Sequence, residues 1–257
     1  MQGSIELKRD PGLQYLLRIG DTCLILAQRM AEWCGHAPVL EEDIALSNMA
    51  LDLLGQARAL LSRAGQLEGR DHHEDQLAFL RDERDYYNVT LVELPGGDFG
   101  FTVLRNAMIS TWLEALWERL LNSSDGDLAA IAATALKEAG YHQRHSAGWV
   151  ERLGDGNDES AARMRAALVT AWPYTHELFD TDEIDAHAAA RGLGPPWTEL
   201  RQPWLTRMRA ILDEARLAMP AEPRFRSGGK RGRHSEHMGY LLAEMQYLQR
   251  AHPGGMW

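Results

Sequence analysis

Long stretches with helical periodicity constrain the fold of this chain more than any other feature of its sequence. Apolar residues recur every three or four positions, Gly, Pro and Asp residues separate the stretches, and alternating β-branched runs are nearly absent. In the first stretch, Leu17, Leu24 and Ala27 fall on one helical face. Gly35 and Pro38 mark its end, because neither residue favours the continuation of a helix. The pattern predicts an all-α fold.

Four of the predicted helices are long, and mostly short links join them, which favours an antiparallel four-helix bundle. We expect the shorter helices that follow to pack around this bundle rather than form a second core. We therefore predict a single domain over residues 1–257, with a core bundle at about 13–153 and accessory helices at about 157–251. The predicted helices cover about 13–34, 41–67, 76–87, 99–121, 125–153, 159–179, 182–190, 198–219 and 235–251.

The charge balance and the cysteine content exclude several classes of partner and site. The chain has 27 Lys and Arg residues against 37 Asp and Glu residues, a formal net charge of −10, which opposes attraction to nucleic acid or anionic lipid. No apolar run is long enough to span a bilayer, and the first residues lack the pattern of a secretory signal. Two cysteines are too few for a disulfide framework or a Cys-type zinc site. We expect a cytoplasmic protein that binds neither nucleic acid nor a membrane.

Long four-helix bundles often hold two metal ions, and the sequence allows a direct test for such a site. The di-iron architecture takes one Glu from each of two helices and a Glu-x-x-His pair from each of the other two, because this spacing aims both side chains at one metal. No histidine of this chain has an acid three residues before it. We therefore predict that the chain carries no metal of its own.

The positions where such pairs would stand still carry polar residues. In Glu138-Ala-Gly-Tyr141 a tyrosine takes the place of the ligand histidine, and in Asp52-Leu-Leu-Gly55 a glycine does. His142 falls on the same helical stripe as Glu138. Buried acids without a metal need hydrogen bonds or ion pairs, so we predict a metal-free polar core at these positions. Its members are Asp52, Glu138, Tyr141 and His142.

Two metal-binding alternatives stay open. Glu138, His142 and His145 place one carboxylate and two imidazoles on neighbouring turns, which resembles a mononuclear iron site. Three ligands from one straight helix are cramped, so other helices would have to contribute. His234 and His237 could also bind a metal, although capping and interface roles fit a helix start better.

A basic, glycine-rich loop stands out in this acidic chain. It lacks the glycine spacing and the Ser or Thr of a phosphate-binding P-loop. Three interpretations stay open: a solvated loop, a surface that contacts an anionic partner, and a module that binds the phosphates of a CoA nucleotide. The cations of the loop are Arg224, Arg226, Lys230, Arg231 and Arg233.

Several strings of residues occur in the order found in one protein family. They are Asp21-Thr-Cys-Leu24, Ala31-Glu-Trp-Cys-Gly-His-Ala-Pro38, Leu51-Asp-Leu-Leu-Gly-Gln-Ala-Arg58, Arg81-Asp-Glu-Arg84, Lys137-Glu-Ala-Gly-Tyr-His142, and the segments 228–237 and 242–250. The strings span nearly the whole chain. On them the sequence resembles the structural C subunits of the phenylacetyl-CoA 1,2-epoxidase family.

The resemblance implies a ferritin-like fold and a non-catalytic subunit of a multicomponent monooxygenase of phenylacetate catabolism. In that enzyme a paralogous subunit holds the di-iron centre and epoxidises the ring of phenylacetyl-CoA with O2. Electrons from NADPH arrive through a separate reductase that contains FAD and an iron–sulfur cluster. The resemblance implies no cofactor and no catalytic residue in this chain. The implied partners are the paralogous di-iron subunit, a small accessory subunit and the reductase, and a homodimer is an alternative for the isolated chain.

We expect the chain to contact its sister subunit through the basic loop and the helix that follows it. Interface centres are enriched in aromatic and Arg residues, and complementary charge raises the rate of association.

Overall fold

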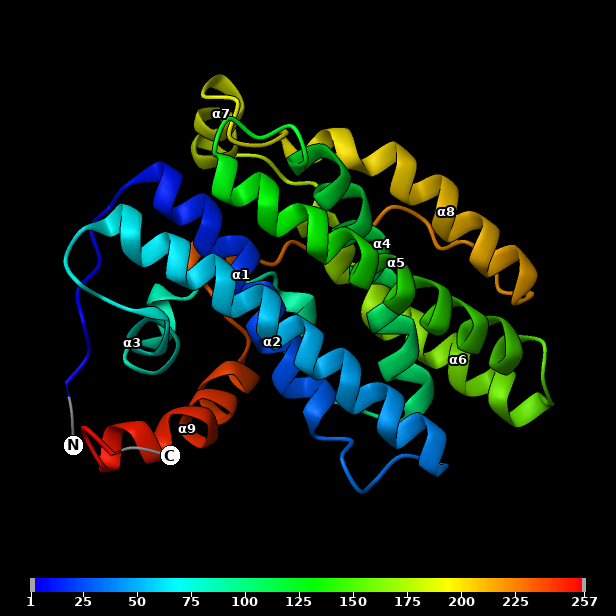
Figure 1. The fold of residues 1–257 in the computed structure, drawn as a ribbon. Coiled ribbons are helices and arrows are strands. Elements are labelled where there is room, and N and C mark those ends of the chain that lie inside the picture. Colours follow the sequence, from blue (N-terminus) through cyan, green and yellow to red (C-terminus); the bar gives the residue numbers. More distant parts are fainter. Residues whose placement is uncertain (1–2, 256–257) are drawn as a thin grey trace.

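The computed structural model describes residues 3–255, and over that range it consists of helices and connecting loops without a β-strand (Figure 1). The predicted all-α class with a four-helix bundle is confirmed. The two residues at each end of the predicted domain lie outside the described range. The long helices of the bundle are α1 Pro11–Ala31, α2 Leu40–Glu68, α4 Phe99–Leu120 and α5 Gly126–Gly154.

The bundle is built from two helical hairpins. α1 packs closely on α2, and α4 packs closely on α5, while α2 and α5 contact each other to close the bundle (Figure 1). Aspartates cap three of the four long helices, α2 being the exception: at the start of α1, Asp10 accepts a hydrogen bond from the backbone N–H of Leu13 at 3.0 Å. Asp98 and Asp125 cap α4 and α5 in the same way. The punctuation seen in the sequence therefore marks real helix starts.

The inner helices of the two hairpins are buried on all sides. Every residue of α1 between positions 15 and 27 is buried, and so is every residue of α4 between 100 and 113. A helix that is buried all round must be covered by other elements on each face. The accessory segments supply that cover.

Five shorter α-helices and several 3-10 helices lie outside the bundle in the described range. The helices are α3 Glu74–Phe79, α6 Asp158–Ala171, α7 Glu183–Ala190, α8 Arg201–Glu214 and α9 Glu236–Ala251, with η1 Glu83–Asp85, η2 Thr90–Val92, η3 Trp172–Leu178, η4 Trp197–Leu200 and η5 Gly229–Arg231. α7 covers α1, α6 and α8 cover α4 and α5, and α9 packs on α3. One continuous apolar cluster joins them to the bundle, from Leu16 of α1 to Met238 of α9. Every described helix is too short or too polar to cross a lipid bilayer.

Three predicted helices are longer than the observed ones. α3 ends at Phe79, and the chain then runs through the largely irregular segment 81–93 along α1. α6 gives way to η3 just before Pro173, which has no N–H to donate and clashes with the preceding turn. α8 ends at Glu214, and Arg216 takes a left-handed φ of 54°. These ends depend on local breaks that the apolar periodicity does not reveal.

A buried ion pair fastens the segment 81–93 to α1. Asp21 and Arg81 are both fully buried. Arg81 Nη1 donates to Asp21 Oδ2 at 2.9 Å, Nη2 donates to the other carboxylate oxygen, and the backbone N–H of Tyr87 donates to Oδ2 at 2.9 Å. Burial alone would lower the pKa of Arg81, but the Asp21 carboxylate raises it above its usual value. The pair therefore stays ionised inside the core.

Asp21→Ala should destabilise the chain severely, because it leaves the Arg81 guanidinium buried without its carboxylate. We expect the free energy of unfolding to fall by about 3–5 kcal/mol, measured by urea denaturation followed by circular dichroism. Glu159→Ala is the matched control, since it breaks an exposed pair with Arg163. That loss should stay below about 1 kcal/mol. Similar losses in the two variants would contradict the structural role of the buried pair.

Candidate functional site

Polar side chains meet inside the bundle where α2 packs on α5. Gln56 Nε2 donates to Glu138 Oε2 at 2.9 Å. His142 Nε2 lies 3.0 Å from Asp52 Oδ2. Gln56 and His142 are buried, whereas the side chain of Asp52 is 38% exposed. Asp52 and Glu138 are the acids at which acid-x-x-His pairs would begin, and each has a partner within the chain.

Two further pairs extend this junction toward both ends of the helices. His145 Nε2 lies 2.9 Å from Glu42 Oε2, and Arg63 Nη2 lies 2.7 Å from Asp125 Oδ2. The residue numbers rise on α2 as they fall on α5, as expected of antiparallel helices. We call these four contacts the polar seam; it consists of Glu42 with His145, Asp52 with His142, Gln56 with Glu138, and Arg63 with Asp125.

The pKa shifts at the centre of the seam follow from burial. Burial raises the pKa of Glu138, the hydrogen bond from Gln56 opposes that shift, and the nearby Asp52 carboxylate adds to it. Burial lowers the pKa of His142, although the contact with Asp52 opposes the shift. A neutral His142 ring then donates its Nε2 proton to Asp52, because a carboxylate can only accept.

The seam matches the predicted polar core in part. Asp52, Glu138 and His142 come together as expected. Tyr141 does not join them: it is 47% exposed, and its ring lies against those of His142 and His145 at 6.2 Å. The prediction for Tyr141 is wrong because the buried stripe of α5 runs through Ala139, His142 and Ser146, and position 141 lies about 100° from 142 around the helix. Gln56, four residues after Asp52, is the buried partner that completes the seam.

A di-iron centre does not fit these side chains. The carboxylate of Glu138 is bound by Gln56, and that of Asp52 by His142. On α1, Cys23 donates from Sγ to Gln56 Oε1 at 3.6 Å, and burial raises the pKa of its thiol, so that it stays protonated. Among residues 3–255, no three His, Cys, Asp or Glu side chains are grouped as metal ligands would be. The potential donors bond to one another instead.

The outer face of α2 exposes large apolar side chains. Leu40 is 72% exposed, Ile44 53% and Leu51 63%. They lie on one helical stripe, opposite the buried one. We call these three residues the α2 ridge. The ridge was not predicted from the sequence, although the apolar residues at 40, 44 and 51 give α2 a second apolar stripe opposite its core-facing one.

Two helical glycines, one on α2 and one on α5, have open space where a Cβ atom would stand. Gly55 follows Leu51 by one turn on the α2 stripe, and Gly148 lies one turn beyond His145 on α5. A Cβ atom at either position would meet nothing within 4 Å. Glycine inside a helix costs about 1 kcal/mol relative to alanine, so its use at an open surface points to contact with something outside the chain.

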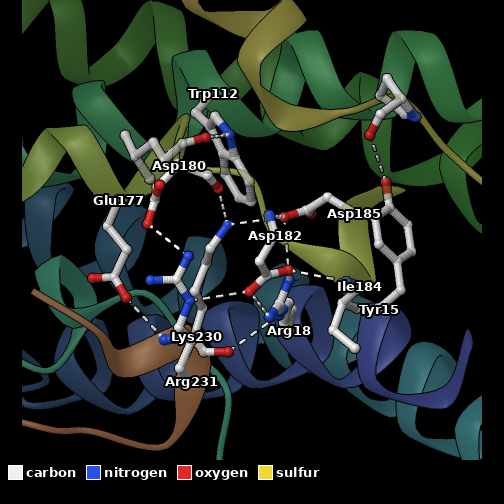
Figure 2. A network of polar contacts seen from close by, with 12 residues as sticks. Tyr15, Arg18, Trp112, Glu177, Asp180, Asp182, Ile184, Asp185, Lys230 and Arg231 are labelled. Atoms are coloured by element: carbon white, nitrogen blue, oxygen red, sulfur yellow. Dashed lines mark hydrogen bonds and ion pairs between the residues drawn. The ribbon is translucent and has the colours of Figure 1, made fainter. Parts of the chain in front are cut away.

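The basic loop is tied into a buried ion network (Figure 2). Arg18 of α1 lies between two carboxylates of the α7 region, 2.6 Å from Asp182 and 3.2 Å from Asp185. Lys230 Nζ lies 3.2 Å from Asp185 Oδ2, and Arg231 Nε lies 3.1 Å from Asp182 Oδ2. Burial alone would raise the pKa of Asp182, but its hydrogen bond with Arg18 holds that pKa far below the usual range. The network joins the loop to α1 and α7.

Lys230 is a structural residue of this network. Its Nζ also donates to the carbonyl of Asp180 and lies 4.5 Å above the ring of Trp197. Its backbone N–H donates to Glu177 Oε1 at 2.8 Å. The prediction that Lys230 contacts a partner or a CoA phosphate is wrong, because the side chain is 1% exposed and already has its partners.

The other loop cations remain at the surface. Arg231 is exposed in part and pairs with Asp180 at 2.9 Å as well as with Asp182. Arg224, Arg226 and Arg233 are exposed. A contact between these arginines and a partner or a phosphate stays a prediction.

His234, at the end of the loop, is held on both sides. Its Nδ1 lies 3.2 Å from Glu93 Oε2 and its Nε2 lies 3.0 Å from the carbonyl of Tyr86. Burial alone would lower the pKa of His234, but the Glu93 carboxylate raises it above the usual value. Burial also raises the pKa of Glu93, so both shifts favour a proton held between the pair. His234 is therefore not free to bind a metal with His237.

Comparison with known proteins places the chain in a family. Residues 2–257 match the model of the phenylacetic acid catabolic protein family. The chain belongs to this family. It is 52% identical over 243 residues to the C subunit of the 1,2-phenylacetyl-CoA epoxidase of Escherichia coli (strain K12). That alignment covers 95% of this chain and 98% of the relative, and the family resemblance seen in the sequence is confirmed.

The ionised His234 should make stability depend on pH. Its contribution is present in full below about pH 6.5, the usual pKa of histidine, and is lost as the pH rises through the raised value of the folded chain. The destabilisation caused by His234→Gln should therefore be largest near pH 6 and shrink toward pH 9, measured by urea denaturation at both pH values. His36→Gln, on the exposed turn after α1, is the control. A destabilisation that grew with pH would contradict the assignment.

Proposed function

We propose that this chain is the non-catalytic structural subunit of a 1,2-phenylacetyl-CoA epoxidase. Its similarity to the C subunit of the Escherichia coli enzyme supports this role, because it extends over nearly the full length of both chains. The observation in the structure that carries the proposal is the polar seam. Glu138 accepts a hydrogen bond from Gln56 and Asp52 contacts His142, so the acids at the positions of the missing acid-x-x-His pairs are engaged within the chain.

The remaining parts of the reaction then belong to the partners. We expect a paralogous subunit to hold the di-iron centre and to epoxidise the ring. A reductase with FAD and an iron–sulfur cluster would deliver the electrons, and a small accessory subunit would complete the enzyme. This chain, a single cytoplasmic domain without a cofactor, would hold the catalytic subunit in its working shape.

The mononuclear metal site and the CoA-binding module are less well supported than the structural role. A mononuclear metal would need Glu138, His142 and His145 to converge, but each of them faces a different partner on α2. A CoA-binding module would need the cations of the basic loop to be free, but Lys230 is buried in the ion network.

Glu138→Gln should leave epoxidation almost unchanged in the reconstituted enzyme. The substitution removes the charge of the carboxylate that a metal in this chain would use, whereas a structural role requires only a hydrogen-bond partner for Gln56. We expect the rate of phenylacetyl-CoA epoxidation to change by less than about twofold, since losing even a supporting group of a metal site typically costs 10- to 100-fold. A loss of about 100-fold in a fully assembled complex would reject the non-catalytic role.

The α2 ridge is the surface that we infer for the sister subunit. The buried centre of a protein interface is apolar, and charged residues are depleted there. The ridge offers three aliphatic anchors on a straight helix. Gly55 and Gly148 leave room for the backbone of a partner to approach closely. The similarity to one subunit of a larger enzyme supports a helical sister subunit as the occupant.

The ridge replaces the basic loop as the first candidate for this contact. In the loop, the side chain of Lys230 is buried and Arg231 forms ion pairs within the chain. The last helix, which was predicted to contribute, exposes Tyr240 and Tyr247, 75% and 63% respectively. The aromatic face of α9 is therefore the second candidate.

Charging the α2 ridge should prevent assembly without unfolding the chain. The triple variant Leu40→Lys, Ile44→Lys and Leu51→Lys should reduce the catalytic subunit recovered by co-purification at least about tenfold, because interface anchors contribute about 2 kcal/mol each. The melting temperature should stay near that of the parent, since all three side chains are exposed. Val169→Lys, at a residue that is 74% exposed on α6, is the matched control.

The outcomes of this experiment separate the candidate surfaces. Unchanged co-purification of the triple variant would reject the ridge. Loss of the complex in Tyr240→Ser with Tyr247→Ser, but not in the triple variant, would assign the contact to α9. If the isolated parent chain forms a dimer that the triple variant does not form, the ridge also serves self-association.

A further inference from the structure

The exposed face of α2 carries a stripe of residues with a seven-residue repeat. Ile44 and Leu51 are 53% and 63% exposed. Asn48, Gly55 and Arg58 are exposed as well, so that exposed residues follow one another at alternating spacings of four and three positions. At about 100° per residue these five positions fall within an arc of about 80°, opposite the buried face of α2. We call these five residues the heptad stripe.

The length of the heptad stripe limits how a partner can lie on it. From Ile44 to Arg58 the helix rises about 21 Å, at about 1.5 Å per residue. A helix that crossed α2 steeply would cover only about one or two turns of this length. Alternating spacings of three and four residues are instead the pattern along which a second helix packs for several turns, inclined by about 20° to the first. The stripe therefore fits a helix that runs alongside α2.

The two lines of the heptad stripe differ in size. Larger side chains form one line, Ile44, Leu51 and Arg58, and smaller residues form the other, Asn48 and Gly55. A Cβ atom on Gly55 would meet nothing within 4 Å, so a large side chain of a second helix has room there. An asparagine within such a stripe fixes the register of the two helices, because its amide needs a polar group opposite it once water is excluded.

A second copy of this chain matches the heptad stripe poorly. In a parallel pair of α2 helices Arg58 would face Arg58, and the like charges would repel each other. In an antiparallel pair centred on Leu51, Arg58 would face Ile44, which places a charge against an apolar side chain. A helix of different sequence avoids both mismatches. The similarity of the chain to one subunit of a larger enzyme favours the sister subunit as the occupant.

We propose that one helix of the sister subunit packs lengthwise on the heptad stripe, with a large apolar side chain over Gly55 and a polar group opposite Asn48. Gly55 and Asn48 then select the partner, whereas the α2 ridge supplies most of the apolar area that becomes buried. This inference rests on the structural role proposed above and goes beyond it, because the ridge alone would also suit a helix that crosses α2 steeply.

Gly55→Leu tests the close approach of the partner helix. The Kd for the purified catalytic subunit should rise at least about tenfold in calorimetry, because the leucine occupies the space of the partner side chain. The melting temperature of the isolated chain should stay unchanged or rise, since leucine favours a helix more than glycine does and its Cβ meets open space. Ala166→Leu, at an exposed position of α6, is the matched control and should leave the Kd unchanged.

Asn48→Leu tests the polar contact by the sign of its effect. If the amide faces a polar group of the partner, the leucine leaves that group buried without a hydrogen bond, and the Kd should rise about tenfold. A purely apolar contact gives the opposite result, because leucine adds buried apolar area and tightens the complex. The isolated chain should keep its melting temperature, since position 48 is exposed.

Two results would overturn the proposal: a Kd of Gly55→Leu within about twofold of that of the parent, or a tighter complex for Asn48→Leu. If the triple lysine variant of the α2 ridge loses the complex while Gly55→Leu keeps it, the partner crosses α2 steeply, and the structural role stands without this inference. If the parent chain forms no complex with the catalytic subunit, the proposed function fails, and this inference fails with it.

Discussion

The charges buried on α1 decide where the rest of the chain packs. Arg18, Asp21 and Arg29 sit on a helix that is covered on all sides, and a buried charge without a partner costs several kcal/mol. Arg18 takes its carboxylates from the α7 region, Asp21 takes a guanidinium from the segment 81–93, and Arg29 bonds to a carbonyl of that same segment. Segments distant in the sequence are therefore held on α1 by polar contacts as well as by apolar packing.

The polar seam provides partners for charged and polar side chains between α2 and α5, as the ion pairs do on α1. Carboxylates and imidazoles at this junction need partners once they are removed from water, and in a metalloprotein the ions would serve. Here Gln56 on α2 bonds to Glu138 on α5, and Asp52 on α2 contacts His142 on α5, so these groups find partners within the bundle. These contacts stabilise the bundle from within, and a structural subunit acts through the surface that it presents.

That surface differs from what the charge pattern of the sequence favours. The basic loop draws attention because it is cationic in an acidic chain, yet its central lysine stabilises the interior. The α2 ridge is inconspicuous in a helix rich in leucine, yet its side chains are among the most exposed apolar groups in the described range. Contact of apolar side chains with water is unfavourable, and exposed groups of them often mark a binding surface. The α2 ridge therefore indicates a partner surface more strongly than the basic loop does.

The sequence by itself determined the features that depend on spacing along one helix. The all-α class, the four long helices and the absence of acid-x-x-His pairs all follow from spacings of three to four residues. Only the tertiary structure decided that Lys230 is buried while Arg226 is exposed, and that Gln56 completes the seam. The physical reason is distance along the chain. Asp185, the partner of Lys230, is 45 positions away, and the pairs of the seam lie on helices that only folding brings together.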